Sequence, residues 1–161
     1  MGWLRRILRV GRIAEPALPR PEQGAAESPA GPFAGSLQVR HVDAGSCNGC
    51  EVEIAAAFGS VYDAERYGAR LVASPRHADA LLVTGVVTRN MAQPLRNTLA
   101  AVPEPRVVLA VGDCARNCGM FARGYGVEGA VGDIVPVDLE VPGCPPRPEQ
   151  IIAALRSVTR R

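Results

Sequence analysis

Short apolar runs alternate with longer amphipathic segments from residue 37 onward. The apolar runs predict five strands, at Leu37–Val42, Arg70–Ala73, Ala80–Thr84, Arg106–Val111 and Ile134–Val141. The spacing of apolar residues predicts helices or helical turns at Glu51–Phe58, Tyr62–Tyr67, Met91–Ala101 and Pro148–Val158. Apolar strands separated by helices form a parallel sheet that is covered on both faces. The pattern therefore predicts a small doubly wound α/β domain with a mostly parallel sheet of the flavodoxin-like type.

The first 36 residues have a different pattern. In residues 1–13, arginines and large apolar residues fall on opposite sides of a helical wheel. This segregation predicts a basic amphipathic helix suited to a membrane surface or to a groove on a partner. The alternative is a short tail that becomes ordered only when bound. Residues 14–36 are rich in Pro, Gly, Ala and Glu and are predicted to be a linker. The folded domain is then expected at 37–161.

The composition limits the class of protein. With 47% hydrophobic and 4% aromatic residues, the core is expected to consist mainly of Val, Leu, Ile and Ala. The net charge of +2 gives no indication of nucleic-acid binding. Arg5 and Arg6 resemble a twin-arginine signal, but Arg9 and Arg12 interrupt the apolar stretch that should follow. The odd number of cysteines, five, favours a reducing compartment over a disulfide framework.

Four of the cysteines directly follow predicted strands. Cys47 and Cys50 follow the first strand, Cys114 the fourth and Cys144 the last. Because ligands of an open parallel sheet bind beyond the carboxyl ends of its strands, we expect these four thiols to meet at one edge. Glycine permits close approach of the backbone. Each loop has a glycine one or two residues before its first cysteine, at Gly45, Gly112 and Gly143.

Four thiolates suit one [4Fe–4S] cluster, and they also suit a structural zinc ion. Zinc sites favour two Cys-x-x-Cys pairs, whereas only Cys47 and Cys50 have that spacing here, so the cluster is favoured. A dithiol redox pair at Cys47 and Cys50 would leave Cys114 and Cys144 without a role. Cys118 lies four residues after Cys114 and would face the same way in a helix. It is expected to be a small buried residue, with a substitute ligand as the alternative.

Other motifs carry weaker signals. The segment Gly124–Gly129 matches G-x-G-x-x-G, but no predicted strand leads into it, so a loop is expected. His41 and His77 are isolated and are expected to pack in the core or on the surface. Glu51 and Glu53 follow Cys50 at a predicted helix start, where carboxylates interact favourably with the helix dipole.

The combined motifs resemble a known family. The segments GSCNGCEVEI, YDAERYG, SPRHADALLVTGVVTRNM, GDC and IVPVDLEVPGCPPRP are similar to the small subunit of membrane-bound, energy-converting [NiFe] hydrogenases. Formate hydrogenlyase belongs to this group, and the family also includes the cluster-bearing B subunit of NADH:quinone oxidoreductase, complex I. The resemblance covers about Leu37 to Leu155.

This resemblance implies that Cys47, Cys50, Cys114 and Cys144 are the ligands of one [4Fe–4S] cluster. Glu53 matches a glutamate that lies three residues after the second ligand, which implies a role near a quinone pocket or in proton movement. Complex I subunits have adjacent cysteines, whereas this chain has C-x-x-C-E-x-E, the hydrogenase form. The chain departs from the family at Cys118, where Gly is more usual.

The resemblance also implies an electron-transfer subunit of an oxidoreductase complex, without a reaction of its own. Expected partners are a catalytic large subunit, a ferredoxin-like subunit with further clusters, and membrane subunits that translocate ions. The expected location is peripheral, on the cytoplasmic side of the cell membrane. A complex I-type subunit that passes electrons to quinone is the first alternative. A zinc-stabilised interaction module is the second.

Overall fold

The structure, a computed structural model, describes Arg9 and residues 33–161. The helix predicted at 1–13 and the linker up to residue 32 lie outside the described residues, apart from Arg9. Phe33 is buried in the core, and the backbone N–H of Gly35 donates to the carbonyl of Thr159 at 2.9 Å. The packed domain therefore includes residues from Phe33 onward.

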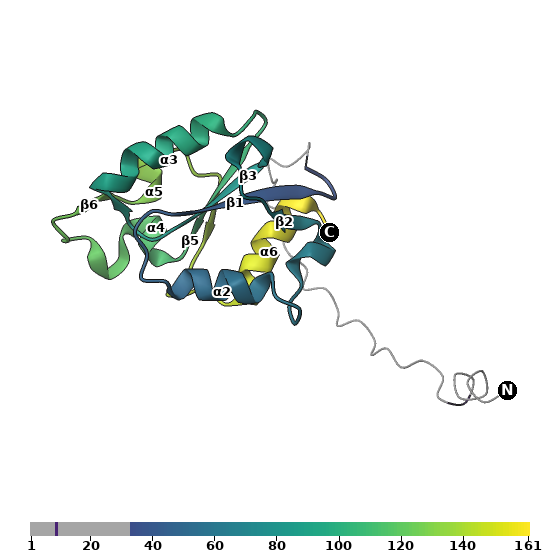
Figure 1. Cartoon of the computed structure of the whole chain (residues 1–161). Helices are drawn as coiled ribbons and strands as arrows, with labels where there is room; N and C mark the ends of the chain where they lie inside the picture. The colour runs from purple at the N-terminus through teal and green to yellow at the C-terminus, as the bar shows by residue number, and fades with distance from the viewer. Residues whose placement is uncertain (1–8, 10–32) are drawn as a thin grey trace.

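Five parallel strands form the central sheet (Figure 1). In chain order they are β1 (Leu37–Asp43), β2 (Ala69–Leu71), β3 (Ala80–Thr84), β5 (Val107–Val111) and β7 (Leu139–Val141). Their spatial order is β2-β1-β3-β5-β7, and every neighbouring pair is parallel. This is the flavodoxin-like order, with its topological switch point between β1 and β3. The prediction of a doubly wound, mostly parallel sheet is confirmed.

Helices cover both faces of the sheet (Figure 1). One face packs against α2 (Gly49–Ala57) and α6 (Pro148–Thr159). The other packs against α3 (Arg89–Ala101), α4 (Asp113–Asn117) and α5 (Val131–Ile134). All five residues of β3 are buried, because alternate side chains enter the two cores. Three short 3₁₀ helices complete the connections, η1 (Ala64–Tyr67), η2 (Pro75–His77) and η3 (Gly119–Phe121).

The strand predicted at Ile134–Val141 is wrong in its first half. Ile134 ends the short helix α5, and the strand begins only at Leu139. Pro136 has no N–H to donate to a sheet ladder, which explains the interruption. Just before the strand, the N–H of Asp138 donates to the carbonyl of Val108 at 2.9 Å, and its carboxylate accepts from the N–H of Val108 at 2.7 Å.

The loop predicted at Gly124–Gly129 is also corrected. Its last residues form β6 (Val127–Gly129), which pairs antiparallel with β4 (Val87–Thr88) in a separate two-stranded sheet. The two segments are far apart in the sequence and very short, so no local pattern indicated their pairing. This small sheet lies beyond the carboxyl edge of the main sheet (Figure 1).

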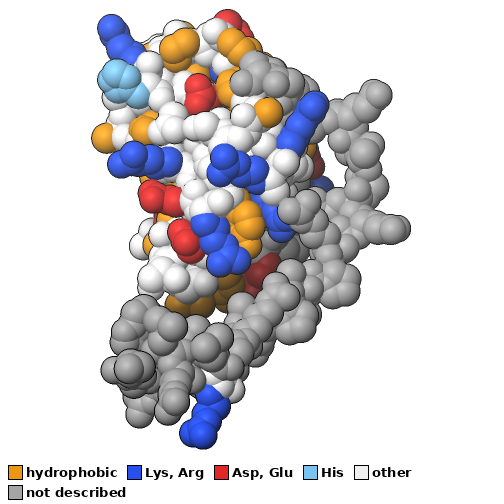
Figure 2. Space-filling view, turned by 90° about the vertical axis from the view of Figure 1, so that its right-hand side faces the viewer, with side chains coloured by type: hydrophobic (Ala, Val, Ile, Leu, Met, Phe, Trp, Pro, Cys, Tyr) orange, Lys and Arg blue, Asp and Glu red, His pale blue; other side chains and the backbone are white. Residues whose placement is uncertain are grey.

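The described surface has mixed charge. On the face seen in Figure 2, arginine side chains are interspersed with acidic and apolar ones. None of the described helices is both long enough and apolar enough to cross a membrane.

Truncation of the sheet core tests this packing. Leu109 is completely buried in the interior strand β5, so Leu109→Ala is expected to lower the free energy of unfolding by about 2–5 kcal/mol. Leu71→Ala is the matched control, because Leu71 is 40% exposed on the edge strand β2, and a loss of about 0.5 kcal/mol or less is expected. Urea unfolding measures both values, and equal losses would contradict the assigned core.

Candidate functional site

The candidate site lies at the carboxyl edge of the sheet. Cys47 lies in the loop after β1, and Cys50 lies in the first turn of α2. Cys114 lies in the first turn of α4, directly after β5, and Cys144 follows β7. Cys50 and Cys114 are buried, whereas Cys47 and Cys144 are exposed. The structure thus brings the four predicted cysteines to one edge from three separate loops.

Main-chain hydrogen bonds join the loops of Cys114 and Cys144. The N–H of Gly112 donates to the carbonyl of Val141 at 2.8 Å, and the N–H of Asp113 donates to the carbonyl of Gly143 at 2.8 Å. In return, the N–H of Gly143 donates to Oδ1 of Asp113 at 3.0 Å. The two loops are therefore held together as one unit, independently of anything that the thiols bind.

The Cys47–Cys50 loop packs closely against this unit. Gly112 has φ +90 and ψ 159, and a Cβ atom added there would lie 2.6 Å from the Sγ atom of Cys50. A Cβ atom added at Gly49 would lie 3.6 Å from Sγ of Cys47 and 3.7 Å from Cγ of Pro145. The thiols of Cys50 and Cys47 consequently lie beside the two other cysteine loops.

The thiols influence one another electrostatically. Burial, together with negative charge on Glu51 and on the thiolates of Cys114, Cys47 and Cys144, raises the pKa of Cys50 to about 12. Burial also raises the pKa of Cys114, followed by the charges of Cys144 and Cys47. Four thiolates at this edge therefore repel one another, and a bound cationic group would offset that repulsion.

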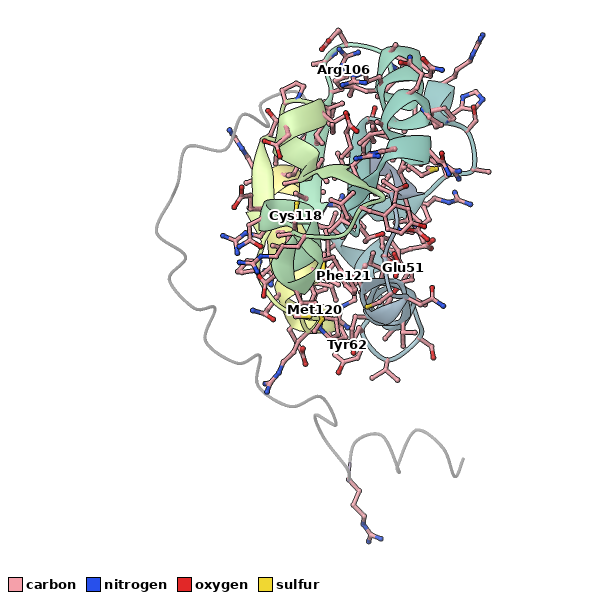
Figure 3. The ribbon with its side chains drawn as sticks, turned by 90° about the vertical axis from the view of Figure 1, so that its left-hand side faces the viewer. Glu51, Tyr62, Arg106, Cys118, Met120 and Phe121 are labelled. Carbon is pink, nitrogen blue, oxygen red and sulfur yellow. The ribbon has the colours of Figure 1, made fainter. Side chains whose placement is uncertain are left out.

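Cys118 occupies a different position from that expected in a continuous helix. The helix α4 ends at Asn117, and Cys118 has φ +64, so the helix does not continue through Cys118. Its N–H donates to the carbonyl of Cys114 at 3.0 Å. Burial raises the pKa of the Cys118 thiol, followed by the charge of Asp133. Cys118 lies at the margin of the site, partly exposed, near Met120 and Phe121 (Figure 3).

A hydrogen-bond network that the sequence did not indicate lies next to the cysteines. The hydroxyl of Ser46 donates to Oε2 of Glu51 at 2.5 Å, and the hydroxyl of Thr84 donates to Oε1 of Glu51. Nε2 of His41 lies 3.0 Å from the Thr84 hydroxyl and 3.6 Å from Oε1 of Glu51. Glu51 and His41 were expected only to cap and to pack. The one available signal was Thr84, a polar residue that ends an otherwise apolar run.

Glu53 has no comparable contacts. Glu53 is partly buried on α2. It is two residues after Glu51, so the two side chains are about 200° apart around the helix axis. Its side chain makes no hydrogen bond or ion pair with another described residue. Its role in proton movement or near quinone remains a prediction.

A groove of about 580 Å³ adjoins the network of Glu51. It is lined by the second half of β1, residues 71–73 and one side of α3, including His41, Leu71 and Met91. No cysteine lines this groove, and His41 is the residue that it shares with the network of Glu51.

Sequence comparisons place the chain among known subunits. The family model described as NADH ubiquinone oxidoreductase, 20 Kd subunit, matches residues 47–158. The chain is 48% identical to the probable membrane-bound hydrogenase subunit mbhJ of Pyrococcus furiosus, over 71% of this chain and 68% of that protein. It is 48% identical to formate hydrogenlyase subunit 7 of Escherichia coli, over 70% of this chain and 44% of that protein. It is 45% identical to the B subunit of the NADH-quinone oxidoreductase of Amoebophilus asiaticus, over 66% of this chain and 67% of that protein.

Solved structures agree with these sequence relatives. A chain of the membrane-bound sulfane sulfur reductase, an archaeal respiratory membrane complex, matches with a TM-score of 0.68 at 31% identity, covering 78% of this chain and 70% of that one. A chain of an NAD+-reducing [NiFe]-hydrogenase has the same fold, with a TM-score of 0.55 at 22% identity over 71% of this chain and 85% of that one. Since the family model covers more than half of the sequence, the chain belongs to the family of the 20 Kd subunit of NADH ubiquinone oxidoreductase.

Proposed function

We propose that this chain is the electron-transfer subunit of a membrane-associated, hydrogenase-like oxidoreductase complex. In this proposal Cys47, Cys50, Cys114 and Cys144 hold one [4Fe–4S] cluster. The observation that carries it is the position of these four cysteines at one sheet edge, on three loops of which the Cys114 and Cys144 loops are hydrogen-bonded to each other. Relatives named as subunits of hydrogenase and of NADH-quinone oxidoreductase support the same class of function.

The donor set fits an iron–sulfur cluster better than zinc. A zinc ion needs its four ligands around a single point, at about 2.0–2.3 Å. Structural zinc sites favour two Cys-x-x-Cys pairs, whereas only Cys47 and Cys50 have that spacing here. In a cubane each thiolate binds a different iron atom, so one pair and two single cysteines on separate loops suit a cluster.

In this proposal, residues of this chain hold the [4Fe–4S] cluster and shield it from water. When bound, a [4Fe–4S] cluster accepts and releases single electrons, at a potential set by charge, hydrogen bonds and solvent. Cys50 and Cys114, which are buried, limit access of water from the side of the domain. Cys47 and Cys144 are exposed and leave the opposite side open toward a partner.

Exposed apolar side chains suggest where that partner binds. Met120 is 83% and Tyr125 is 94% exposed on the segment after α4, and Val52 is 62% exposed on α2. Figure 3, which views the molecule from this side, shows Met120 and Phe121 near Cys118. Apolar side chains around an electron-transfer site are suited to the buried part of a subunit interface. We assign this edge to a catalytic large subunit.

The hydrogenase branch is favoured by the spacing of Cys47 and Cys50. The family resemblance gives C-x-x-C to hydrogenases and adjacent cysteines to complex I. The similar identity to the NADH-quinone oxidoreductase relative, 45%, keeps a quinone-reducing complex as the alternative. A large-subunit partner with paired Cys-x-x-Cys motifs near each end would support the hydrogenase assignment, because nickel needs those thiolates.

The other proposed partners are those that the family resemblance implies. The mbhJ subunit is named as part of a membrane-bound hydrogenase. By analogy, this chain would lie on the cytoplasmic side of the membrane, next to a ferredoxin-like subunit and to ion-translocating membrane subunits. Residues 1–13 are the proposed contact with the membrane or with those subunits.

Anaerobic purification tests the cofactor. The full chain is expected to be brown, to contain about four iron atoms, and to give an iron-dependent EPR signal on reduction. Cys144→Ala is expected to lose the cluster or to retain a three-iron form. Cys118→Ala is the matched control and is expected to keep the full iron content. A colourless protein with stoichiometric zinc would defeat the proposal, and equal iron loss in both variants would refute the ligand assignment.

A glycine substitution tests the close approach of the loops. Gly112 has a backbone conformation that is essentially restricted to glycine, so Gly112→Ala is expected to destabilise the fold by about 1–3 kcal/mol. It should also reduce iron content, because the added Cβ would displace the Cys50 thiol. Gly132→Ala is the control, since a Cβ atom there meets no atom within 4 Å. Iron analysis and urea unfolding measure both effects, and full iron retention in Gly112→Ala would contradict the assigned packing.

A further inference from the structure

The directions of the hydrogen bonds around Glu51 indicate an ionised carboxylate. The Ser46 hydroxyl accepts from the N–H of Asn48 at 3.0 Å, so its single proton is free for Oε2 of Glu51. Nε2 of His41 lies 3.0 Å from the Thr84 hydroxyl. The Thr84 hydroxyl donates its proton to Oε1 of Glu51. A group that accepts at both oxygens is a carboxylate.

This carboxylate connects the first cysteine loop to the sheet. Through Ser46 it contacts the residue before Cys47, and through Thr84 it contacts the end of β3. Glu51 itself directly follows Cys50 in α2. The loop is further restrained because a Cβ atom at Gly85 would clash with the N atom of Ser46. The network therefore spans the switch point between β1 and β3.

The charge is poorly screened by solvent. The Glu51 side chain is 17% exposed, and Thr84 is completely buried. Burial lowers the pKa of His41, the neighbouring residue that could carry a positive charge, and so disfavours a charge that would compensate Glu51. Charges in such partly buried positions interact more strongly than they do in water.

From this arrangement we propose that Glu51 is a positioning residue with a fixed negative charge. It holds the Cys47–Cys50 loop against β3, and it lowers the reduction potential of the group bound by the four thiolates. Reduction adds one electron to that group, so a fixed negative charge beside it disfavours the reduced form. The inference rests on the proposed function, and it concerns Glu51, which was expected only to interact with the helix dipole.

The test compares two charge-neutralising substitutions on the same helix. In the full chain, purified anaerobically and titrated with dithionite, Glu51→Gln is expected to favour reduction at least tenfold. For one electron this corresponds to a rise in potential of about 59 mV. The EPR signal of the reduced protein should also change, because the loop loses an acceptor. Glu53→Gln removes the same charge outside the network and is expected to change the equilibrium less than threefold.

A second pair of variants, at Thr84, tests the inference if Glu51→Gln fails to fold. Thr84→Val keeps the size of the side chain but removes its hydroxyl, whereas Thr84→Ser keeps the hydroxyl. Thr84→Val is expected to alter the potential and the EPR signal, and Thr84→Ser to restore wild-type values. A merely structural role of Thr84 in core packing would give the reverse order, because Ser leaves a cavity and Val does not.

The outcomes separate the two proposals. Iron-containing Glu51→Gln and Thr84→Val proteins with wild-type potentials would overturn this inference and leave the proposed function intact. Equal shifts in Glu51→Gln and Glu53→Gln would also overturn it, since position in the network would then be irrelevant. A wild-type chain that binds no iron would overturn the proposed function, and the inference with it.

Discussion

The parallel direction of the five strands is the constraint on which the rest of this structure depends. Because every strand of the main sheet runs the same way, every loop that follows a strand lies at one edge. Cys47, Cys114 and Cys144 are far apart in the sequence, yet they reach this edge because they follow β1, β5 and β7. The strand between them, β3, brings no cysteine. It ends in Thr84, which contacts the first cysteine loop through Glu51.

Placing the four thiols close together is electrostatically unfavourable, and hydrogen bonds between the loops oppose their separation. Burial and mutual repulsion raise the pKa of Cys50 and Cys114, so the thiolate forms are unfavourable without a bound cation. The hydrogen bonds from Gly112 to Val141 and between Asp113 and Gly143 hold two of the loops together whatever the charge of the thiols. The site is therefore arranged by the fold, and a metal group would bind to loops that already lie together.

The chain's role depends on what covers this edge. Its relatives include subunits named for hydrogen chemistry and for quinone reduction, at nearly the same identity. In the proposed function, the adjacent subunit supplies the reaction and this chain supplies the electron-transfer site. The exposed Met120 lies on the segment beside Cys118, where a partner would bury it. The hydrogenase and quinone-reducing alternatives of the proposal thus share one type of domain and differ in the neighbouring subunit.

The sequence by itself determined the sheet, its covering on both faces and the edge at which four cysteines lie, because apolar runs and strand ends are local patterns. It did not determine the start of β7, which Pro136 delays, or the pairing of β4 with β6. It also missed the contact of His41 and Thr84 with Glu51. Only the tertiary structure decided these features, because they depend on side chains and segments from separate elements whose proximity no local pattern encodes.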